Sequence, residues 1–235
     1  MSQRIAIINQ KGGVGKSTTA QAIGAGIALK GFSVLFVDLD AQGNLSYSMG
    51  ADTGGYNAMG VLERPETAKE EIQHTQNGDI IASSPKLAGA DKFLEETGKE
   101  YRLREALEGL EGLYDFVIID TPPALGVLTI NALTASTGAI IPAQADPYSL
   151  QGIVQLNSTI ETVRKYCNPD LSIMGIVLTR FNARTIIRRE VAEMLEQTAE
   201  QLQTKLYKAR IRECISLVEA QAVKEHIYTY APRSN

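Results

Sequence analysis

Short apolar runs alternate with longer segments of helical spacing along the chain, and this alternation is typical of a β–α fold. Apolar runs predict strands at 4–8, 33–37, 79–82, 115–119, 138–142, 171–178 and 206–211. The segments between them predict helices at 17–30, 57–62, 85–94, 103–110, 149–166, 185–202 and 217–223. We therefore expect an α/β fold, with residues 1–235 forming one domain around a doubly wound, mostly parallel sheet flanked by helices. Ligands of such sheets bind at the carboxyl ends of the strands.

The composition is that of an ordinary globular protein, with 44% hydrophobic and 21% charged residues. No apolar run approaches the roughly 20 residues that span a bilayer, and the first residues lack the layout of a signal peptide. The two cysteines, Cys167 and Cys214, are far apart and lack metal-ligand spacing. We expect reduced thiols and a cytoplasmic location.

The most informative stretch runs from Ile5 to Thr18, where an apolar strand leads into a glycine-rich turn and then a helix. Such turns direct backbone N–H groups and a helix N-terminus at phosphate oxygens. Lys16 can reach the β- and γ-phosphates, and the Ser17 hydroxyl can ligate Mg²⁺. The standard phosphate-loop pattern requires glycine where this chain has Gln10, and the chain places an additional lysine, Lys11, at the mouth of the loop. A dinucleotide-binding turn is excluded because its third glycine position is Thr18.

Acidic side chains follow two further predicted strands. Asp38 and Asp40 come after the second strand, and Asp120 ends the strand at 115–119. In a phosphate site, an acid at a strand end commonly holds Mg²⁺ through its waters. We expect Asp120 to do so with Ser17 as the direct ligand and Asp38 supporting the same shell. Asp40 could orient a water for attack on the γ-phosphorus.

Charge is distributed unevenly along the chain, which has a net charge of −4. Residues 1–175 carry 13 basic and 20 acidic side chains, whereas residues 176–235 carry 10 basic and 7 acidic ones. This asymmetry indicates a basic surface near the C-terminal end, although solvated helix faces explain the charges alone equally well.

Together, these segments resemble the ParA branch of the deviant Walker A P-loop ATPases, a family that also includes MinD-type division-site proteins. The phosphate loop at 11–17 resembles the deviant loop of the family, 38–44 its switch I, and 120–123 its switch II. The resemblance continues through 178–185, 217–221 and 230–234, and so covers nearly the whole chain.

The resemblance implies an ATP hydrolase in which two subunits hold two ATP molecules between them, with Mg²⁺ as the metal. Lys11 would cross to the phosphates of the neighbouring subunit, adding positive charge where negative charge accumulates during transfer. Lys11, Lys16 and Asp40 are then the expected catalytic residues. The expected ATP-binding residues are Lys11, Gly12, Gly13, Val14, Gly15, Lys16, Ser17, Thr18, Arg180 and Asn182.

Segregation ATPases of this family bind DNA nonspecifically as ATP dimers and respond to a ParB-like centromere-binding partner. Phosphate contacts of this kind need lysines and arginines without base readout. The candidates are Arg184, Arg188, Arg189, Arg210, Arg212 and Lys224. The family often has an arginine where this chain has Ser216, so the individual DNA contacts remain open.

Two other functions fit the nucleotide motifs. A MinD-like membrane-cycling regulator would need a C-terminal basic amphipathic helix, which the sequence lacks, so we expect no membrane contact. An ATP-dependent synthetase would need a second substrate site, and the sequence offers no further acid, base or nucleophile cluster. His74 and His226 are isolated. We expect a nucleoid-associated ATPase of bacterial type that drives DNA segregation.

Overall fold

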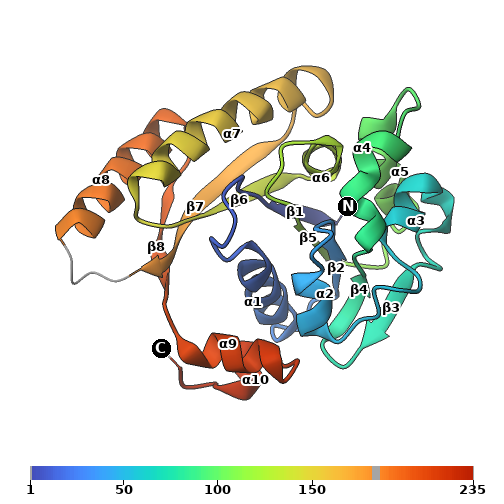
Figure 1. Ribbon diagram of the computed structural model, residues 1–235, viewed down its shortest axis with the longest axis horizontal. Coiled ribbons are helices and arrows are strands. Elements are labelled where there is room, and N and C mark those ends of the chain that lie inside the picture. The colour runs from blue at the N-terminus through green and yellow to red at the C-terminus, as the bar shows by residue number, and fades with distance from the viewer. Residues whose placement is uncertain (1, 182–185, 235) are drawn as a thin grey trace.

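The computed structural model describes residues 2–181 and 186–234, except that the side chains of residues 147 and 186–189 lie outside the description. Among these residues, eight strands form a single sheet in the order β3-β4-β2-β5-β1-β6-β7-β8 (Figure 1). All neighbours run parallel except β3 and β4, which form an antiparallel hairpin. The strands are β1 (Gln3–Ile7), β2 (Val34–Asp38), β3 (Ile72–Thr75), β4 (Gly78–Ile81), β5 (Phe116–Asp120), β6 (Gly138–Ala143), β7 (Ser172–Phe181) and β8 (Leu206–Arg212).

The central strands of the sheet carry apolar side chains on both of their sides, and helices cover both faces and bury these side chains. One core packs beneath α3 (Ala58–Glu63), α5 (Arg102–Glu108), α6 (Val127–Ala135), α7 (Pro147–Tyr166) and α8 (Ile186–Gln201). The opposite core packs against α1 (Lys16–Ala28) and α2 (Asn44–Met49). The expected doubly wound, mostly parallel α/β sheet is confirmed.

The α1 helix approaches β2 closely at Gly24. A Cβ atom built on Gly24 would lie 2.2 Å from Cε1 and Cζ of Phe36, which is 1% exposed. Since that ring is enclosed by the core, the absence of a side chain at Gly24 sets the separation between helix and sheet. This packing holds the N-terminus of α1 in place at the carboxyl edge of the sheet.

The last segment of the chain returns from one edge of the sheet to the other. After β8, α9 (Ile215–Ala222) and α10 (Ile227–Tyr230) lie under α1 (Figure 1). The carbonyl of Lys224 accepts hydrogen bonds from Asn77 Nδ2 at 2.8 Å and Gln76 Nε2 at 3.2 Å, in the turn of the β3–β4 hairpin. The segment that follows one edge strand is thus fastened to the opposite edge.

All the predicted strands and helices are present, with ends that differ by a few residues, and the 85–94 helix is divided into a 3-10 turn (Pro85–Gly89) and α4 (Ala90–Phe93). The sequence patterns did not indicate α2, β3, α6 or α10, nor the short 3-10 turns at Pro65–Thr67 and Lys99–Tyr101. Within the described residues, no helix is both long and apolar enough to cross a bilayer.

Candidate nucleotide-binding site

The loop between β1 and α1 presents its backbone amides to an open cleft. Gly13 and Gly15 have φ values of 72° and 86°, which favour glycine, and Gly15 caps α1 without any side-chain hydrogen bond. The first N–H groups of α1 therefore remain available, at the positive end of the helix dipole. The loop is fixed from below, because Val14 is buried and its carbonyl accepts a hydrogen bond from Thr179 Oγ1 at 2.7 Å. This geometry suits an anion.

Lys16 is the first residue of α1 and is 7% exposed. Its ammonium group lies 3.5 Å from the carbonyl oxygen of Lys11. Burial lowers the pKa of Lys16, and the nearby carboxylates of Asp120 and Asp40 act in the opposite direction. Lys16 is therefore a buried cation beside two acids, at the floor of the loop.

Asp120 is fully buried, and neither of its carboxylate oxygens makes a hydrogen bond with the described residues. Burial raises its pKa well above the ordinary value, the charge of Asp38 adds to this, and the nearby Ser17 hydroxyl lowers it. Asp38 and Asp120 are partners in the register of the neighbouring strands β2 and β5, which explains their interaction. A buried carboxylate without partners, next to a hydroxyl, fits a hydrated divalent cation such as Mg²⁺.

Asp38 differs from Asp120 because its oxygens are already occupied. Oδ2 accepts hydrogen bonds from the backbone N–H and the hydroxyl of Ser46, at 2.8 and 2.7 Å, and Oδ1 accepts one from Asp40 N at 3.1 Å. Burial raises the pKa of Asp38 to about 6, in spite of these hydrogen bonds. Asp38 holds the loop that follows β2, and its support of a metal shell stays a prediction.

Asp40 lies in that loop, 9% exposed, and lines the same cleft as the phosphate loop. Its Oδ1 accepts a hydrogen bond from Gln42 N at 3.1 Å, and within the part of the chain that the structure describes Oδ2 accepts none. The cleft has a volume of about 660 Å³. Its lining includes Gly12, Gly13, Gly15, Lys16, Ser17, Thr18, Asp40, Pro123 and Arg180. The structure therefore brings the predicted loop, Lys16 and Asp40 together.

Lys11, at the loop mouth, forms an ion pair within its own chain. Its Nζ lies 2.6 Å from Oδ2 of Asp146, which caps α7 by accepting a hydrogen bond from Ser149 N at 3.1 Å. Gln10 also contacts α7, donating to the carbonyl of Gly152 at 3.2 Å. The two residues at which the loop departs from the standard pattern, Gln10 and Lys11, are thus the ones that contact α7 and its cap. Contact of Lys11 with a second subunit stays a prediction.

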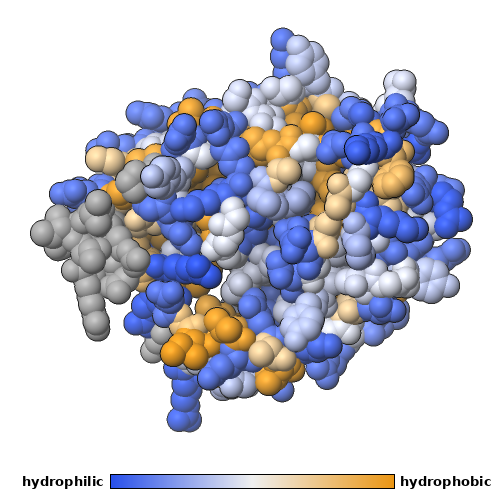
Figure 2. Space-filling model, in the orientation of Figure 1, coloured by the Kyte–Doolittle hydropathy of each residue, from blue (hydrophilic) through white to orange (hydrophobic). Residues whose placement is uncertain are grey.

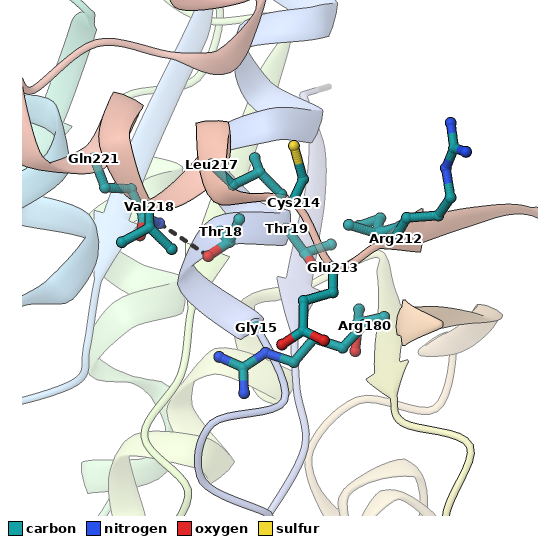
Figure 3. Close-up of a pocket in the computed structure, with 12 residues that line it drawn as sticks. Gly15, Thr18, Thr19, Arg180, Arg212, Glu213, Cys214, Leu217, Val218 and Gln221 are labelled. Carbon is teal, nitrogen blue, oxygen red and sulfur yellow. Dashed lines mark hydrogen bonds between the residues drawn. The ribbon is translucent and has the colours of Figure 1, made fainter. Parts of the chain in front are cut away.

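A smaller pocket adjoins the cleft beneath α9 (Figure 3). Gln221 on α9 donates a hydrogen bond to Thr18 Oγ1 at 2.9 Å, joining the C-terminal segment to the first turn of α1, directly after the phosphate loop. Arg180, at the end of β7, has a φ of 47° and extends toward the loop, whereas the side chain of Arg212 points away from it (Figure 3). Of the predicted ATP-binding residues, Asn182 lies outside the described residues.

The predicted DNA-binding residues are only partly described. Arg184 lies outside the described residues, and Arg188 and Arg189 belong to α8 but their side chains are not described. Arg210 and Arg212 are exposed on the edge strand β8, and the Arg210 guanidinium carbon lies 4.4 Å from the centre of the Phe181 ring. Lys224 lies apart from them, with its ammonium 5.3 Å from the Tyr47 ring on α2.

Apolar side chains gather over α9 on the face that carries the cleft (Figure 2). Ile215 is 78% and Val218 67% exposed. The surface around α9 is thus more apolar than the charge asymmetry of the sequence indicates.

Sequence reasoning did not identify Asp146, Ser46 or Ser83 as parts of this region. Asp146 precedes Pro147, and an acid before a proline is a start signal for a helix, so its place as a cap could have been found. Its pairing with Lys11 had no local signal. Ser46 lies in α2, directly after the loop that follows β2, whereas Ser83 reaches this loop because β4 lies next to β2.

Comparison with known proteins identifies relatives for the whole chain. The profile of a family described as "AAA domain" matches residues 2–173. The chain is 41% identical over 239 residues to the sporulation initiation inhibitor protein Soj of Bacillus subtilis (strain 168), covering 100% of this chain and 93% of the relative. It is 38% identical to the chromosome-partitioning ATPase Soj of Thermus thermophilus, covering 99% and 90%.

Solved structures with a similar fold include two that contain a bound nucleotide. A Mycobacterium smegmatis protein named cobyrinic acid a,c-diamide synthase, with bound ATP analog and magnesium, has a TM-score of 0.83 at 34% identity, covering 99% of this chain and 98% of that one. A putative plasmid partition protein from Borrelia burgdorferi bound to AMPPNP has a TM-score of 0.82 at 25% identity, covering 98% and 96%. The extent of these matches, together with the phosphate loop and the acids beside it, shows that the chain belongs to the ParA/Soj family of partition ATPases.

Proposed function

We propose that this ATPase dimerises on Mg²⁺-ATP, binds DNA nonspecifically in that state, and is released when ATP is hydrolysed. It would do so as one domain, on the nucleoid, under the control of a ParB-like centromere-binding partner. The observation that carries the proposal is the convergence of uncapped loop amides, Lys16, Asp40 and Asp120 at one end of the sheet. A relative that matches 99% of this chain is named a chromosome-partitioning ATPase, and this supports a role of the cycle in DNA segregation.

The residues divide the chemistry among them. The amides after Gly13 and Gly15 would bind the phosphate oxygens, and Lys16 would neutralise the charge that accumulates on them. Ser17 and Asp120 would hold Mg²⁺, which would neutralise phosphate charge when bound. Asp40, with one free oxygen in the cleft, would orient the attacking water. Hydrolysis then removes the phosphate that holds the two subunits together.

Lys11 would have a different anionic partner in the single chain and in the dimer. In the single chain it is bound to Asp146, so reaching the phosphates of a neighbour requires exchange of one anion for another. The γ-phosphate supplies negative charge that ADP lacks at the position that Lys11 would reach, so the exchange would favour a dimer with ATP over a dimer with ADP. Loss of the γ-phosphate would return Lys11 to Asp146 and allow the subunits to separate.

DNA contact would involve the basic edge of the sheet. Arg210 and Arg212 occupy alternate positions on β8, so they project from the same side of an exposed strand, and Figure 3 shows the Arg212 side chain directed away from the pocket beneath α9. Contacts of this kind with phosphates are sequence-independent and weaken with salt. Replacing both arginines with alanine should lower DNA affinity for all sequences, with a shallower salt dependence and unchanged ATP turnover without DNA.

The name of the Mycobacterium smegmatis neighbour indicates a biosynthetic amidation, which would need a second substrate site next to the nucleotide. We favour partition because two relatives named for chromosome partition, from Thermus thermophilus and Caulobacter vibrioides, match this chain over 90% and 86% of their own length. A turnover assay with glutamine and a cobyrinic acid substrate separates the two, since a partition ATPase should form no amide.

The decisive experiment is DNA pelleting with ATP, ADP or no nucleotide, alongside liposomes of anionic lipid. DNA binding with ATP alone and no liposome binding supports the proposal, whereas liposome binding without DNA binding would indicate a membrane-cycling regulator.

Lys11→Ala should bind ATP but neither dimerise nor hydrolyse it. A Lys11→Ala variant with normal turnover would overturn the role of this lysine.

A further inference from the structure

We propose that Ser83 is a positioning residue for ATP hydrolysis, because its hydroxyl fixes the backbone of Asp40. This inference rests on the proposed role of Asp40 in orienting the attacking water. Ser83 lies two residues beyond the end of β4, outside the phosphate loop and outside the loops that follow β2 and β5. It has no place in the sequence motifs of the nucleotide site.

Ser83 contacts the loop after β2 through its hydroxyl and α2 through its backbone N–H. Its hydroxyl donates a hydrogen bond to the carbonyl oxygen of Asp40 at 2.5 Å, and its N–H donates one to Ser46 Oγ at 2.8 Å. The Ser46 hydroxyl in turn donates to Asp38 Oδ2 at 2.7 Å. A chain of hydrogen bonds therefore runs from Asp38 through Ser46 and Ser83 to the backbone of Asp40.

These groups are shielded from water. Ser83, Ser46 and Asp38 are each 0% exposed, so their hydrogen bonds are not exchanged for bonds to solvent. The Asp40 carbonyl also accepts a hydrogen bond from Gly43 N at 2.8 Å, but that bond lies within the same loop. Among the described residues, the hydrogen bond from Ser83 is the one that ties this carbonyl to a neighbouring strand end.

The direction of the Asp40 side chain depends on this carbonyl. Rotation of the peptide after Asp40 would move the N–H of the next residues, including Gln42 N, which donates to Asp40 Oδ1 at 3.1 Å. Ser83 therefore limits the orientations in which the second carboxylate oxygen faces the cleft. Because catalysis depends on placement within fractions of an ångström, losing this restraint should slow hydrolysis more than it weakens ATP binding.

The neighbouring Ser84 offers a matched control. It is also buried, at 3% exposed, but its hydroxyl accepts a hydrogen bond from Lys86 N and caps the 3-10 turn at Pro85–Gly89. Ser83→Ala and Ser84→Ala each remove one buried serine hydroxyl from the same strand end. The Ser83→Ala variant keeps the backbone N–H that contacts Ser46, so it removes only the contact with Asp40.

The test measures kcat for Mg²⁺-ATP hydrolysis, the dissociation constant of a fluorescent ATP analogue, and thermal unfolding for each variant. Ser83→Ala should lower kcat by about fivefold to tenfold with nucleotide affinity within twofold of the original, and Ser84→Ala should change neither. Adding Ser83→Ala to an Asp40→Ala protein should produce no further loss of rate. Ser83→Cys preserves volume but donates weakly, so it provides the same comparison should the alanine variant not fold.

Equal kcat values for the two alanine variants would overturn the proposal, as would a loss of nucleotide affinity with kcat unchanged. If Asp40→Ala alone hydrolyses ATP at the original rate, the role of Asp40 fails and this inference fails with it. If Asp40→Ala is slow and Ser83→Ala is normal, only the inference about Ser83 fails.

Discussion

Replacing Asp146 with asparagine removes the charge that binds Lys11 within its own chain. Asparagine is as good a helix cap as aspartate, so the hydrogen bond to Ser149 N and the start of α7 should be preserved. If Lys11 must leave Asp146 to reach a second subunit, the variant should form the ATP dimer more readily. The same change should leave the ADP form monomeric, because ADP lacks the phosphate that Lys11 would hold.

The size of the effect follows from the exposure of the pair. The Lys11 and Asp146 side chains are 34% and 26% exposed, so the 2.6 Å contact is screened in part by solvent. Exposed pairs contribute about 0.2–1 kcal/mol, and a partly buried one lies near the upper end of that range. Two such pairs are broken per dimer, for a total of about 1.5 kcal/mol, so the dimer should be roughly tenfold tighter.

Analytical ultracentrifugation at several protein concentrations, with a non-hydrolysable ATP analogue and Mg²⁺, measures the dimer dissociation constant. Glu161→Gln is a suitable control, since it breaks a 2.6 Å ion pair with Arg164 at the other end of the same helix. ATP affinity is measured separately, because removing a negative charge near the cleft also favours the nucleotide. An unchanged or weaker dimer in Asp146→Asn, with α7 intact, would refute the exchange of Lys11 between the two anions.

Three further expectations concern stability and can be measured by urea or thermal unfolding of the nucleotide-free protein. Asp120→Asn should stabilise the nucleotide-free fold at neutral pH by about 2 kcal/mol while abolishing Mg²⁺-dependent turnover, because burial and the charge of Asp38 disfavour the ionised carboxylate more than Lys16 and the Ser17 hydroxyl favour it. A destabilised variant would contradict this. Burial raises the pKa of Asp38 from 3.8 to about 6, so the folded chain binds this proton more tightly than the unfolded chain. The contribution of this group to the free energy of unfolding is therefore greatest below pH 4 and is lost as the pH rises through 6. A free energy of unfolding that stays constant between pH 4 and 6 would argue against this. Gly24→Ala should destabilise the fold by about 3 kcal/mol, since its methyl group would meet the Phe36 ring, whereas Gly26→Ala in the same helix should change stability by less than about 1 kcal/mol.

The sequence patterns predicted the sheet and its helices well where hydrophobic periodicity was clear. They did not indicate α6, because Val127–Ala135 is buried on almost all sides and carries no polar stripe to mark a helical period. β3 was missed for the opposite reason, since Ile72–Thr75 is a short edge strand with half-exposed side chains. α6 depends on neighbours that are remote in sequence, such as β1 and α7, whereas β3 pairs with β4, which directly follows it in the chain.

The same distinction applies to the site. The phosphate loop, Asp40 and Asp120 were predictable because each belongs to a contiguous pattern of strand, turn and acid. The contact of Lys11 with Asp146 joins residues 135 positions apart, and that of Ser83 with Asp40 joins residues 43 apart. Only the order of the strands determines these pairs, and no local spacing encodes it.

The hydrogen bonds that connect Lys224 to the β3–β4 hairpin have a consequence for synthesis. Residues 77 and 224 are 147 positions apart, so this contact must wait until residue 224 has left the ribosome. Until α9 has been synthesised, Thr18 also lacks its partner Gln221, and the helix that packs over the nucleotide cleft is absent. A chain interrupted before α9 would thus have all its nucleotide motifs and still lack the hydrogen bonds that join the segment after β8 to the β3–β4 hairpin at the opposite edge of the sheet.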